Sequence, residues 1–334
     1  MHILVLDTIH GGKPIGEAFA ARGDSVDCVD IYRGQGGIDE KTAMSRDYDM
    51  VVAPVHLDPD HPLLHFSKGP VISHHEGVRQ LLDGNIPVPM IEITGAKGKT
   101  TTAHALAFLM PGKGILHTSS GTYLFPERKW LFRSSITPGS VLGAAMSARD
   151  IHGWLIVEES LGITCLGNLG IITSGEDYSF AAGKKSALAS KIASARGCKN
   201  LLLAQNINTD HAGHVVHMED VARCEGIECT IMLGKTRTRF SNPLLSLPGY
   251  KTSLVLAAIA ATILGIDPSP LSSFTAVPGR MSLSYDKGFL VIDNANSGTN
   301  LATTLEAAQY ARNTSGKDEI TLVIGQEEGD GAVC

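Results

Sequence analysis

The sequence lacks three features that would each indicate a particular class of protein. No apolar run approaches the roughly 20 residues of a membrane-spanning helix. Lysine and arginine total 28 against 34 acidic residues, and the net charge of −6 gives no basic field for nucleic acid. Residues 1–7 are apolar and strand-like, without the basic region and cleavage site of a signal peptide. We therefore expect a cytoplasmic protein with no membrane or nucleic-acid partner.

Zinc-ligand spacing is also missing. The six cysteines are scattered, and the close pair Cys224 and Cys229 has no second pair beside it, so we expect reduced thiols. His211, His214 and His217 could hold a metal, but no carboxylate or cysteine completes the set. Their surroundings are typical of an exposed loop.

Strand-like apolar runs alternate with helix-like stretches along most of the chain, which predicts an α/β protein with parallel sheets. A chain of 334 residues is long enough for two or three domains. We predict a first domain over residues 1–89, a central domain over 90–280 and a last domain over 281–334. The last would hold only about two strands and one helix, too few to bury a core, so we expect it to be truncated.

The expected strands cover residues 3–6, 25–30, 50–53, 91–94, 114–117, 154–158, 170–173, 201–204, 230–233, 289–293 and 319–325. The expected helices cover residues 15–22, 100–109, 184–195, 252–264 and 301–311.

A glycine-rich turn follows the apolar strand at residues 91–94, and a helix can begin directly after it. Backbone N–H groups of such a turn, together with the positive end of the helix, bind polyphosphate. Lys99 would reach the outer phosphates, and the Thr100 hydroxyl would hold Mg²⁺. The predicted phosphate site consists of Gly95, Ala96, Lys97, Gly98, Lys99, Thr100 and Thr101.

The turn is shorter than the common Walker sequence, which would place a glycine at Ile93. Its form, G-x-x-G-K-T-T, resembles the phosphate loop of the Mur ligase superfamily. That resemblance implies three domains: a Rossmann-like first domain, a central P-loop ATPase domain with a mostly parallel sheet, and a Rossmann-like last domain, present here in part. It also implies ATP and Mg²⁺ as cofactors, and activation of a substrate carboxylate as an acyl phosphate.

An acidic pair ends the buried strand at residues 154–158. Glu158 and Glu159 lie at its carboxyl end, the edge where open α/β sheets bind ligands. A carboxylate there could hold the same Mg²⁺ as Thr100 and offset phosphate charge. The segment resembles the Glu-x-Ser strand end of Mur ligases, with Glu158 in the metal position. A solvated acidic pair is the alternative.

Two lysines follow the expected strand at residues 170–173. Mur ligases carry at this point a helix with a lysine that takes up carbon dioxide as a carbamate and can bind a second Mg²⁺. By resemblance Lys185 takes this catalytic and metal-binding role, with Lys184 close behind, and a solvated helix start is the alternative. Tyr178 stands where the family usually has a metal-binding histidine, and tyrosine is a poor Mg²⁺ ligand at neutral pH.

Two segments near the start of the last domain also match the superfamily. Pro278, Gly279 and Arg280 resemble its hinge motif, and an arginine there could contact the transferring phosphate as a fixed cation. Asp293 resembles the aspartate that reaches the nucleotide, while Asn296 replaces the usual histidine or lysine. An Asp293 that only forms a turn is the alternative.

Histidines are concentrated in the first domain, where residues 1–75 hold seven of the chain's thirteen. His10, His56, His74 and His75 lie near expected strand ends and would face one cleft as substrate-binding residues. Imidazoles suit a polycarboxylate or a metal complex. Solvated loop histidines are the alternative.

Within the superfamily, the opening at residues 6–12 and the His-His-Glu-Gly-Val segment at 74–78 resemble archaeal coenzyme F-430 synthases. That resemblance implies ring closure on a nickel tetrapyrrole, seco-F-430 acid, in methanogenic archaea. ATP would phosphorylate a propionate, and a ring carbon would attack the acyl phosphate. Two alternatives stay open: a Mur-type amide ligase that adds an amino acid to a cell-wall (pseudomurein) or cofactor precursor, and a nucleotide-gated protein that binds nickel or a tetrapyrrole.

Overall fold

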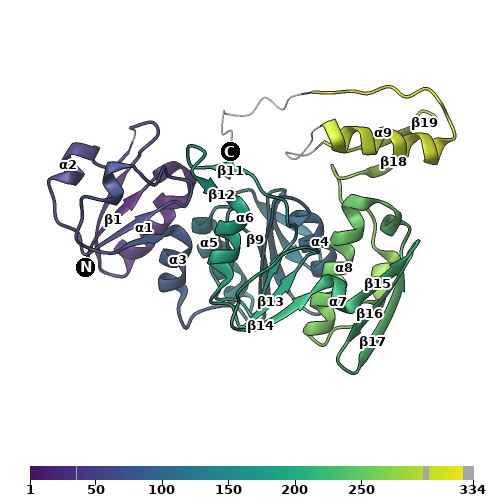
Figure 1. Cartoon of the computed structure of the whole chain (residues 1–334), viewed down its shortest axis with the longest axis horizontal. Helices are drawn as coiled ribbons and strands as arrows, with labels where there is room; N and C mark the ends of the chain where they lie inside the picture. The colour runs from purple at the N-terminus through teal and green to yellow at the C-terminus, as the bar shows by residue number, and fades with distance from the viewer. Residues whose placement is uncertain (35, 296–300, 326–334) are drawn as a thin grey trace. The chain divides into compact units, whose positions relative to one another are not determined.

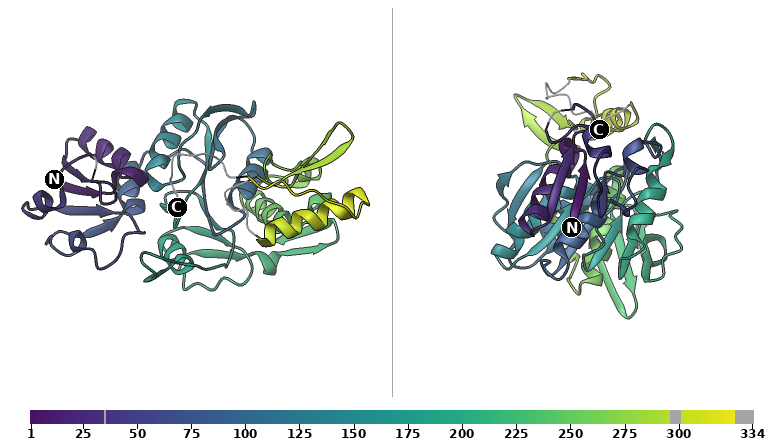
Figure 2. Two further views of the ribbon diagram at one scale, coloured as in Figure 1. Left: turned by 90° about the horizontal axis from the view of Figure 1, so that it is seen from above. Right: turned by 90° about the vertical axis from the view of Figure 1, so that its left-hand side faces the viewer.

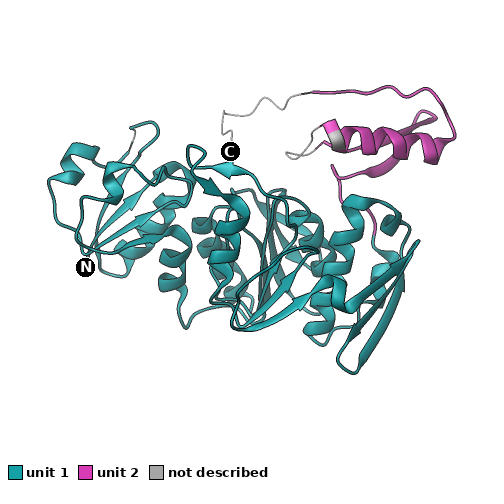
Figure 3. Ribbon diagram, viewed as in Figure 1, with its two compact units in different colours: residues 1–274 teal, residues 275–334 magenta. Residues whose placement is uncertain are grey.

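The structure is a computed structural model of the chain and describes residues 1–34, 36–295 and 301–325. Its contacts divide the chain into two compact units, residues 1–274 and 275–334 (Figure 3). The first unit contains a four-stranded parallel sheet and an eight-stranded mixed sheet, each with its helices (Figure 1). The α/β class is therefore confirmed. The boundaries expected after residues 89 and 280 stay predictions, the first of them lying between the two sheets of one unit.

The first sheet consists of four parallel strands. Its elements are β1 (His2–Leu6), α1 (Lys13–Ala21), β2 (Ser25–Val29), α2 (Glu40–Met44), β3 (Met50–Ala53), β4 (Val71–Ser73) and α3 (His74–Leu82). The strand order is β2-β1-β3-β4. A capping box between Ser73 and Glu76 starts α3 directly at the end of β4. Because the strands are parallel, β1, β3 and β4 all end at the edge where the histidine segments begin.

The second sheet has eight strands and carries the phosphate loop. Its elements are β5 (Met90–Thr94), α4 (Lys99–Leu109), β6 (Gly114–Thr118), β7 (Gly121–Phe125), β8 (Lys129–Phe132), α5 (Pro138–Asp150), β9 (Trp154–Glu158), β10 (Leu169–Ile172), α6 (Ala187–Ala195), β13 (Asn200–Leu203), β14 (His214–His217) and α8 (Pro248–Ile263). The order is β14-β13-β10-β5-β9-β6-β7-β8, with β7 and β8 antiparallel. β5 is thus central, and all of its residues, Glu92 included, are buried, as expected for a parallel strand covered on both faces.

In the central region one expected strand is confirmed, in a sheet of its own, and one expected helix is wrong in its start. The strand expected at residues 230–233 belongs to β16 (Glu228–Leu233), which pairs antiparallel with β15 (Ala222–Glu225) and β17 (Thr236–Ser241) in a separate sheet. The helix expected from residue 184 begins only at Ala187, because β12 (Lys185–Ser186) pairs with β11 (Ser179–Phe180). A four-residue helix α7 (Met218–Val221) precedes β15.

One hydrophobic core joins the two sheets of the first unit. Ile15 of α1 and Val78 of α3 belong to the same buried cluster as Val141 of α5. Gly11 and Gly139 let the turn after β1 approach the start of α5, because a Cβ on Gly139 would lie 2.2 Å from the Gly11 carbonyl oxygen. Figure 2 shows this region from two further directions. The carboxyl edge of the first sheet is therefore packed against the central domain.

The second unit is small. It contains the hairpin β18 (Ser282–Asp286) and β19 (Phe289–Asp293), followed by α9 (Leu301–Ser315). The helix expected at residues 301–311 is confirmed and extends to Ser315. The strand expected at residues 319–325 is wrong, since these residues form no strand in the structure. Asn296 lies outside the described residues.

Four cysteines are paired, so the expectation of reduced thiols is wrong for them. Cys165 is bonded to Cys198, and Cys224 is bonded to Cys229, whereas Cys28 is free. The second pair bridges opposite residues of β15 and β16.

The sequence predicts no membrane-spanning helix, and the structure gives the length and packing of the apolar helices. The apolar helix α8 packs against α4 inside the first unit. In the described ranges, no helix combines the length and apolar character needed to cross a bilayer.

Candidate active site

The predicted phosphate loop leaves the sheet at its middle, between β5 and α4. β5 lies between β9 and β10, and ligands of open α/β sheets bind at this carboxyl edge. Gly98 caps α4 with φ of 82°, and Gly95 has φ of 151°. A Cβ on Gly95 would lie 2.1 Å from Thr173 Oγ1, so only glycine fits there. The geometry is that of an anion site at a helix N-terminus.

Two hydroxyl side chains that we did not predict hold this loop in place. Thr173 Oγ1 donates to the carbonyl oxygens of Lys97 at 2.6 Å and Thr94 at 3.2 Å. Ser174 Oγ accepts from the N–H groups of Ala96 at 3.0 Å and Lys97 at 3.3 Å. Both residues follow β10, the strand beside β5. Their only sequence signal was a polar pair at the end of an apolar strand.

The magnesium-binding pair predicted from the sequence comes together. Thr100 Oγ1 donates to Glu158 Oε2 at 2.7 Å, and both side chains are almost completely buried. The N–H of Ser119, which follows β6, donates to the same oxygen at 3.1 Å. The Lys99 Nζ lies 3.7 Å from Glu158 Oε1 and donates to the Gly95 carbonyl at 3.0 Å. A hydroxyl and a carboxylate are oxygen ligands of the kind that Mg²⁺ prefers, so this donor set fits the ion.

Lys184 and Lys185 contact the loop that follows β3. Lys184 Nζ forms ion pairs with Asp58 at 2.7 Å and Asp60 at 2.6 Å. Lys185 Nζ donates to the carbonyl oxygens of Val55 at 2.9 Å and Leu57 at 3.4 Å, and burial lowers its pKa. These contacts tie β12 to the first domain. The carbamate role of Lys185 stays a prediction.

A third lysine, Lys191 on α6, has the buried surroundings that favour the neutral amine needed to form a carbamate. Its side chain is 1% exposed, and its Nζ makes no hydrogen bond within the described part of the chain. The Nζ lies 4.9 Å from the centre of the Tyr178 ring. Burial, together with the nearby Lys99 cation, lowers the pKa of Lys191 to about 8. Sequence reasoning missed Lys191, because its spacing alone did not show that it is buried.

The second acidic residue of the pair, Glu159, points into the protein. Its side chain is completely buried near the buried Glu92. Burial, and then the charge of Glu92, raise the pKa of Glu159 well above its usual range. Glu92 accepts hydrogen bonds from Thr164 Oγ1 at 2.5 Å and from the Gly167 N–H at 2.7 Å. Glu158 therefore faces the loop, while Glu159 points away from it into the protein.

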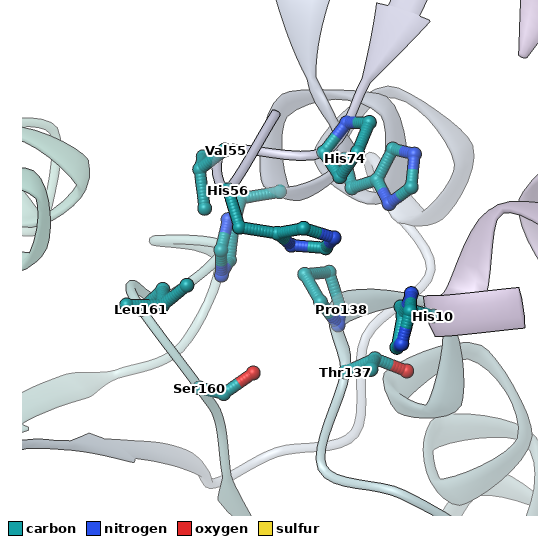
Figure 4. Close-up of a pocket in the computed structure, with 10 residues that line it drawn as sticks. His10, Val55, His56, His74, Thr137, Pro138, Ser160 and Leu161 are labelled. Carbon is teal, nitrogen blue, oxygen red and sulfur yellow. The ribbon is translucent and has the colours of Figure 1, made fainter. Parts of the chain in front are cut away.

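The four histidines predicted to bind substrate line one pocket (Figure 4). His10 and His56 follow β1 and β3, and His74 and His75 begin α3. Burial lowers the pKa of His74 to about 4 and that of His75 to about 3, so both rings are neutral. The opposite wall comes from the central domain, with Thr137, Pro138, Ser160 and Leu161. The four histidines thus share one small pocket, and their substrate-binding role stays a prediction.

The pocket is close to the phosphate site along the chain. Ser160, which lines the pocket, stands two residues after Glu158, and its N–H donates to the Ile136 carbonyl at 2.9 Å. Thr137 comes next, at the start of α5. The segment that ends β9 thus connects the two halves of the site.

Arg280 and Asp293 lie in the second unit. Asp293 Oδ2 accepts from the Gly279 N–H at 3.0 Å, and its Oδ1 accepts from the Ala295 N–H at 3.0 Å. The Arg280 N–H donates to the Val277 carbonyl at 3.0 Å. Asp293 thus holds the turn that carries Arg280, and nucleotide contact by either side chain stays a prediction.

Named relatives match nearly the whole chain. The coenzyme F(430) synthetase of Methanosarcina acetivorans is 31% identical, and the match covers 97% of this chain and 83% of that protein. The chain belongs to the coenzyme F(430) synthetase family. The family's member from Methanocaldococcus jannaschii is 26% identical over 92% of this chain and 79% of its own length. The family model described as "Coenzyme F430 synthetase CfbE, C-terminal domain" matches residues 283–334.

Solved structures share the fold of this family member. A UDP-N-acetylmuramoyl-L-alanyl-D-glutamate–2,6-diaminopimelate ligase superposes with a TM-score of 0.51 at 14% identity, covering 87% of this chain and 63% of that one. The bifunctional folylpolyglutamate synthase/dihydrofolate synthase of Yersinia pestis gives 0.52 at 14%, covering 72% and 70%. Identities this low show the fold alone, and that fold is the one the phosphate loop predicted.

Proposed function

We propose that this chain is an ATP-dependent ligase that completes coenzyme F-430 by closing a carbocyclic ring on a nickel tetrapyrrole acid. The observation that carries the proposal is the family match along 97% of the chain. The geometry supports it, because a glycine-rich loop, a lysine and a buried Thr100–Glu158 pair lie at one sheet edge.

The first step activates the acid. A carboxylate is a poor electrophile, because its charge is delocalised and its leaving group is poor. A carboxylate oxygen of the substrate attacks the γ-phosphorus of ATP, and ADP leaves. Lys99 stabilises the negative charge on the transferring phosphoryl group, and Arg280 stays the predicted second cation. Thr100 and Glu158 would hold Mg²⁺, which neutralises phosphate charge when bound.

The second step forms the ring. A carbon of the substrate attacks the acyl carbon, a carbon–carbon bond forms, phosphate leaves with its electron pair, and the attacking carbon loses a proton. Water must be kept from the acyl phosphate, which would otherwise hydrolyse. We place the carboxyl end of the acid beside Ser160, because that residue lines the pocket and stands two residues from Glu158.

Lys191 replaces Lys185 as the residue that we propose to carry a carbamate. Carbon dioxide reacts with a neutral amine, and the lowered pKa of Lys191 supplies one. The product is an acquired carboxylate beside the Lys99 cation, with one proton released. The carbamate oxygens would be ligands for a second Mg²⁺, in a site where Tyr178 is a poor ligand.

Trapping with hydroxylamine tests the function. Protein, ATP, Mg²⁺ and seco-F-430 acid should give a hydroxamate, and without hydroxylamine the acid should be consumed with no added amine. Lys99→Ala should lower turnover by about 10²–10³-fold or more, the usual loss for one charge-stabilising donor. The exposed Lys113→Ala is the matched control and should leave turnover unchanged. Turnover that requires an amino acid would instead identify an amide ligase.

A further inference from the structure

A carboxylate and two imidazoles form a cluster at the carboxyl edge of the first sheet. Asp7 follows β1, His10 lies in the turn after it, and His56 follows β3. Within residues 1–34, 36–295 and 301–325, these three form the group whose potential metal-ligand atoms all lie within 4.8 Å of one another. The group does not include the histidines of the 211–217 segment. Two imidazoles with a carboxylate suit divalent transition metals such as Ni²⁺ and Zn²⁺.

The separations between the ligand atoms match those around a single ion. Asp7 Oδ2 lies 3.0 Å from His10 Nδ1 and 3.1 Å from His56 Nε2. Metal–nitrogen and metal–oxygen bonds of about 2.1 Å put two ligands at right angles roughly 3.0 Å apart. Two of the three separations are therefore those of ligands around one ion, and the third, between the two imidazole nitrogens, is at most 4.8 Å.

The surrounding structure fixes the carboxylate. Asp7 is completely buried, and its Oδ1 accepts from the N–H groups of Ile9 at 3.1 Å and His10 at 3.0 Å. Its Oδ2 is the oxygen that contacts both imidazoles, while Oδ1 also lies 3.1 Å from His10 Nδ1. The Tyr32 ring packs on both imidazoles, with centroids 5.2 and 5.7 Å away.

The cluster is open to the substrate pocket. The side chains of His10 and His56 are each 28% exposed, and both line the pocket. None of the described residues that line it is a lysine or arginine, and the rings of His74 and His75 are neutral. An acid that enters the pocket would therefore meet no fixed cation from its walls.

We propose that Asp7, His10 and His56 hold one divalent transition-metal ion, whose open positions bind a carboxylate of the acid substrate. One carboxylate and two neutral imidazoles leave the bound ion with a net charge of +1 for that acid. The bond to the acid rests on the proposed function, whereas the ion site itself does not.

Cobalt titration tests the site without ATP or acid. Chelator-treated full-length protein is titrated with Co²⁺ in excess Mg²⁺, which occupies the phosphate-loop site, and visible absorption and heat are recorded. The wild type should bind one Co²⁺ through nitrogen and oxygen ligands, without a thiolate charge-transfer band. His10→Ala and His56→Ala should each weaken binding by more than the roughly 10–100-fold that loss of an outer-shell partner costs. His65→Ala is the matched control, because His65 is exposed and bonds only to the Pro59 carbonyl among the described contacts.

Each outcome decides the question. Equal Co²⁺ binding by the wild type and both variants, or a thiolate band, overturns the site. The ion site is also overturned if free Co²⁺ and Ni²⁺ do not bind, but the spectrum of a nickel tetrapyrrole shifts with the wild type and not with His10→Ala. That result would make the His10 imidazole a ligand of the substrate's own metal. Should an alanine variant fail to fold, His10→Gln and His56→Gln keep the side-chain volume. Co²⁺ binding together with absent hydroxamate would separate a failed function from a valid ion site.

Discussion

The carbamate on Lys191 gives the sharpest test of the active site. The fall in pKa from 10.5 to about 8 raises the neutral fraction of the amine at pH 7.5 from about 0.1% to roughly 24%, an increase of about 200-fold. Only the neutral amine attacks carbon dioxide, so Lys191 should react where exposed lysines do not. Protein equilibrated with ¹³C-bicarbonate should show one carbamate resonance by ¹³C NMR.

The variants decide which lysine carries the group. Lys191→Ala should lose the resonance and most of the ligase activity, and small carboxylic acids should restore part of that activity by occupying the vacated space. Lys185→Ala should keep the resonance, because Lys185 Nζ is engaged with the carbonyls of Val55 and Leu57. A resonance that survives in Lys191→Ala and disappears in Lys185→Ala would refute the reasoning.

Two further predictions follow from buried contacts. Gly95→Ala should abolish ATP binding in calorimetry, because the new Cβ would meet Thr173 Oγ1 at 2.1 Å. The control Gly143→Ala lies on an open face of α5 and should bind ATP normally. Equal ATP binding by both variants would contradict the loop geometry. For Glu159, a folded-state pKa raised above 4.5 means that its stabilisation is fully present below pH 4.5 and is lost as pH rises through the folded-state pKa. Glu159→Gln removes the ionisation beside Glu92. In urea titrations, the unfolding free energy of this variant should therefore exceed that of the wild type by an amount that grows between pH 5 and pH 8. Parallel pH profiles of the two proteins would show that Glu159 does not titrate as described.

Local spacing predicted the phosphate site, because its chemistry lies within seven consecutive residues. A strand, two glycines, a lysine and a threonine in this order are typical of such a turn. Glu158 was predictable for a related reason: parallel strands end at one edge, so the last residue of a buried strand lies near the loop. The structure confirms that Lys99, Thr100 and Glu158 lie together.

The sequence predicted some elements without revealing their pairing. Apolar alternation indicated a strand at residues 230–233 but not the antiparallel sheet that contains it. Likewise, the pairing of Cys165 with Cys198 depends on how two loops meet, and their spacing of 33 residues does not reveal this.

The sequence by itself determined the family and the phosphate loop, because their motifs consist of residues near one another in the chain. It also indicated the histidines at the ends of the first strands, because each of them lies near the end of an apolar run. Only the tertiary structure decided that Lys191 is buried while Lys185 is bonded to backbone, and that Asp7 joins His10 to His56. Burial, and with it the pKa of a side chain, depends on what packs around it, and those neighbours come from distant parts of the chain.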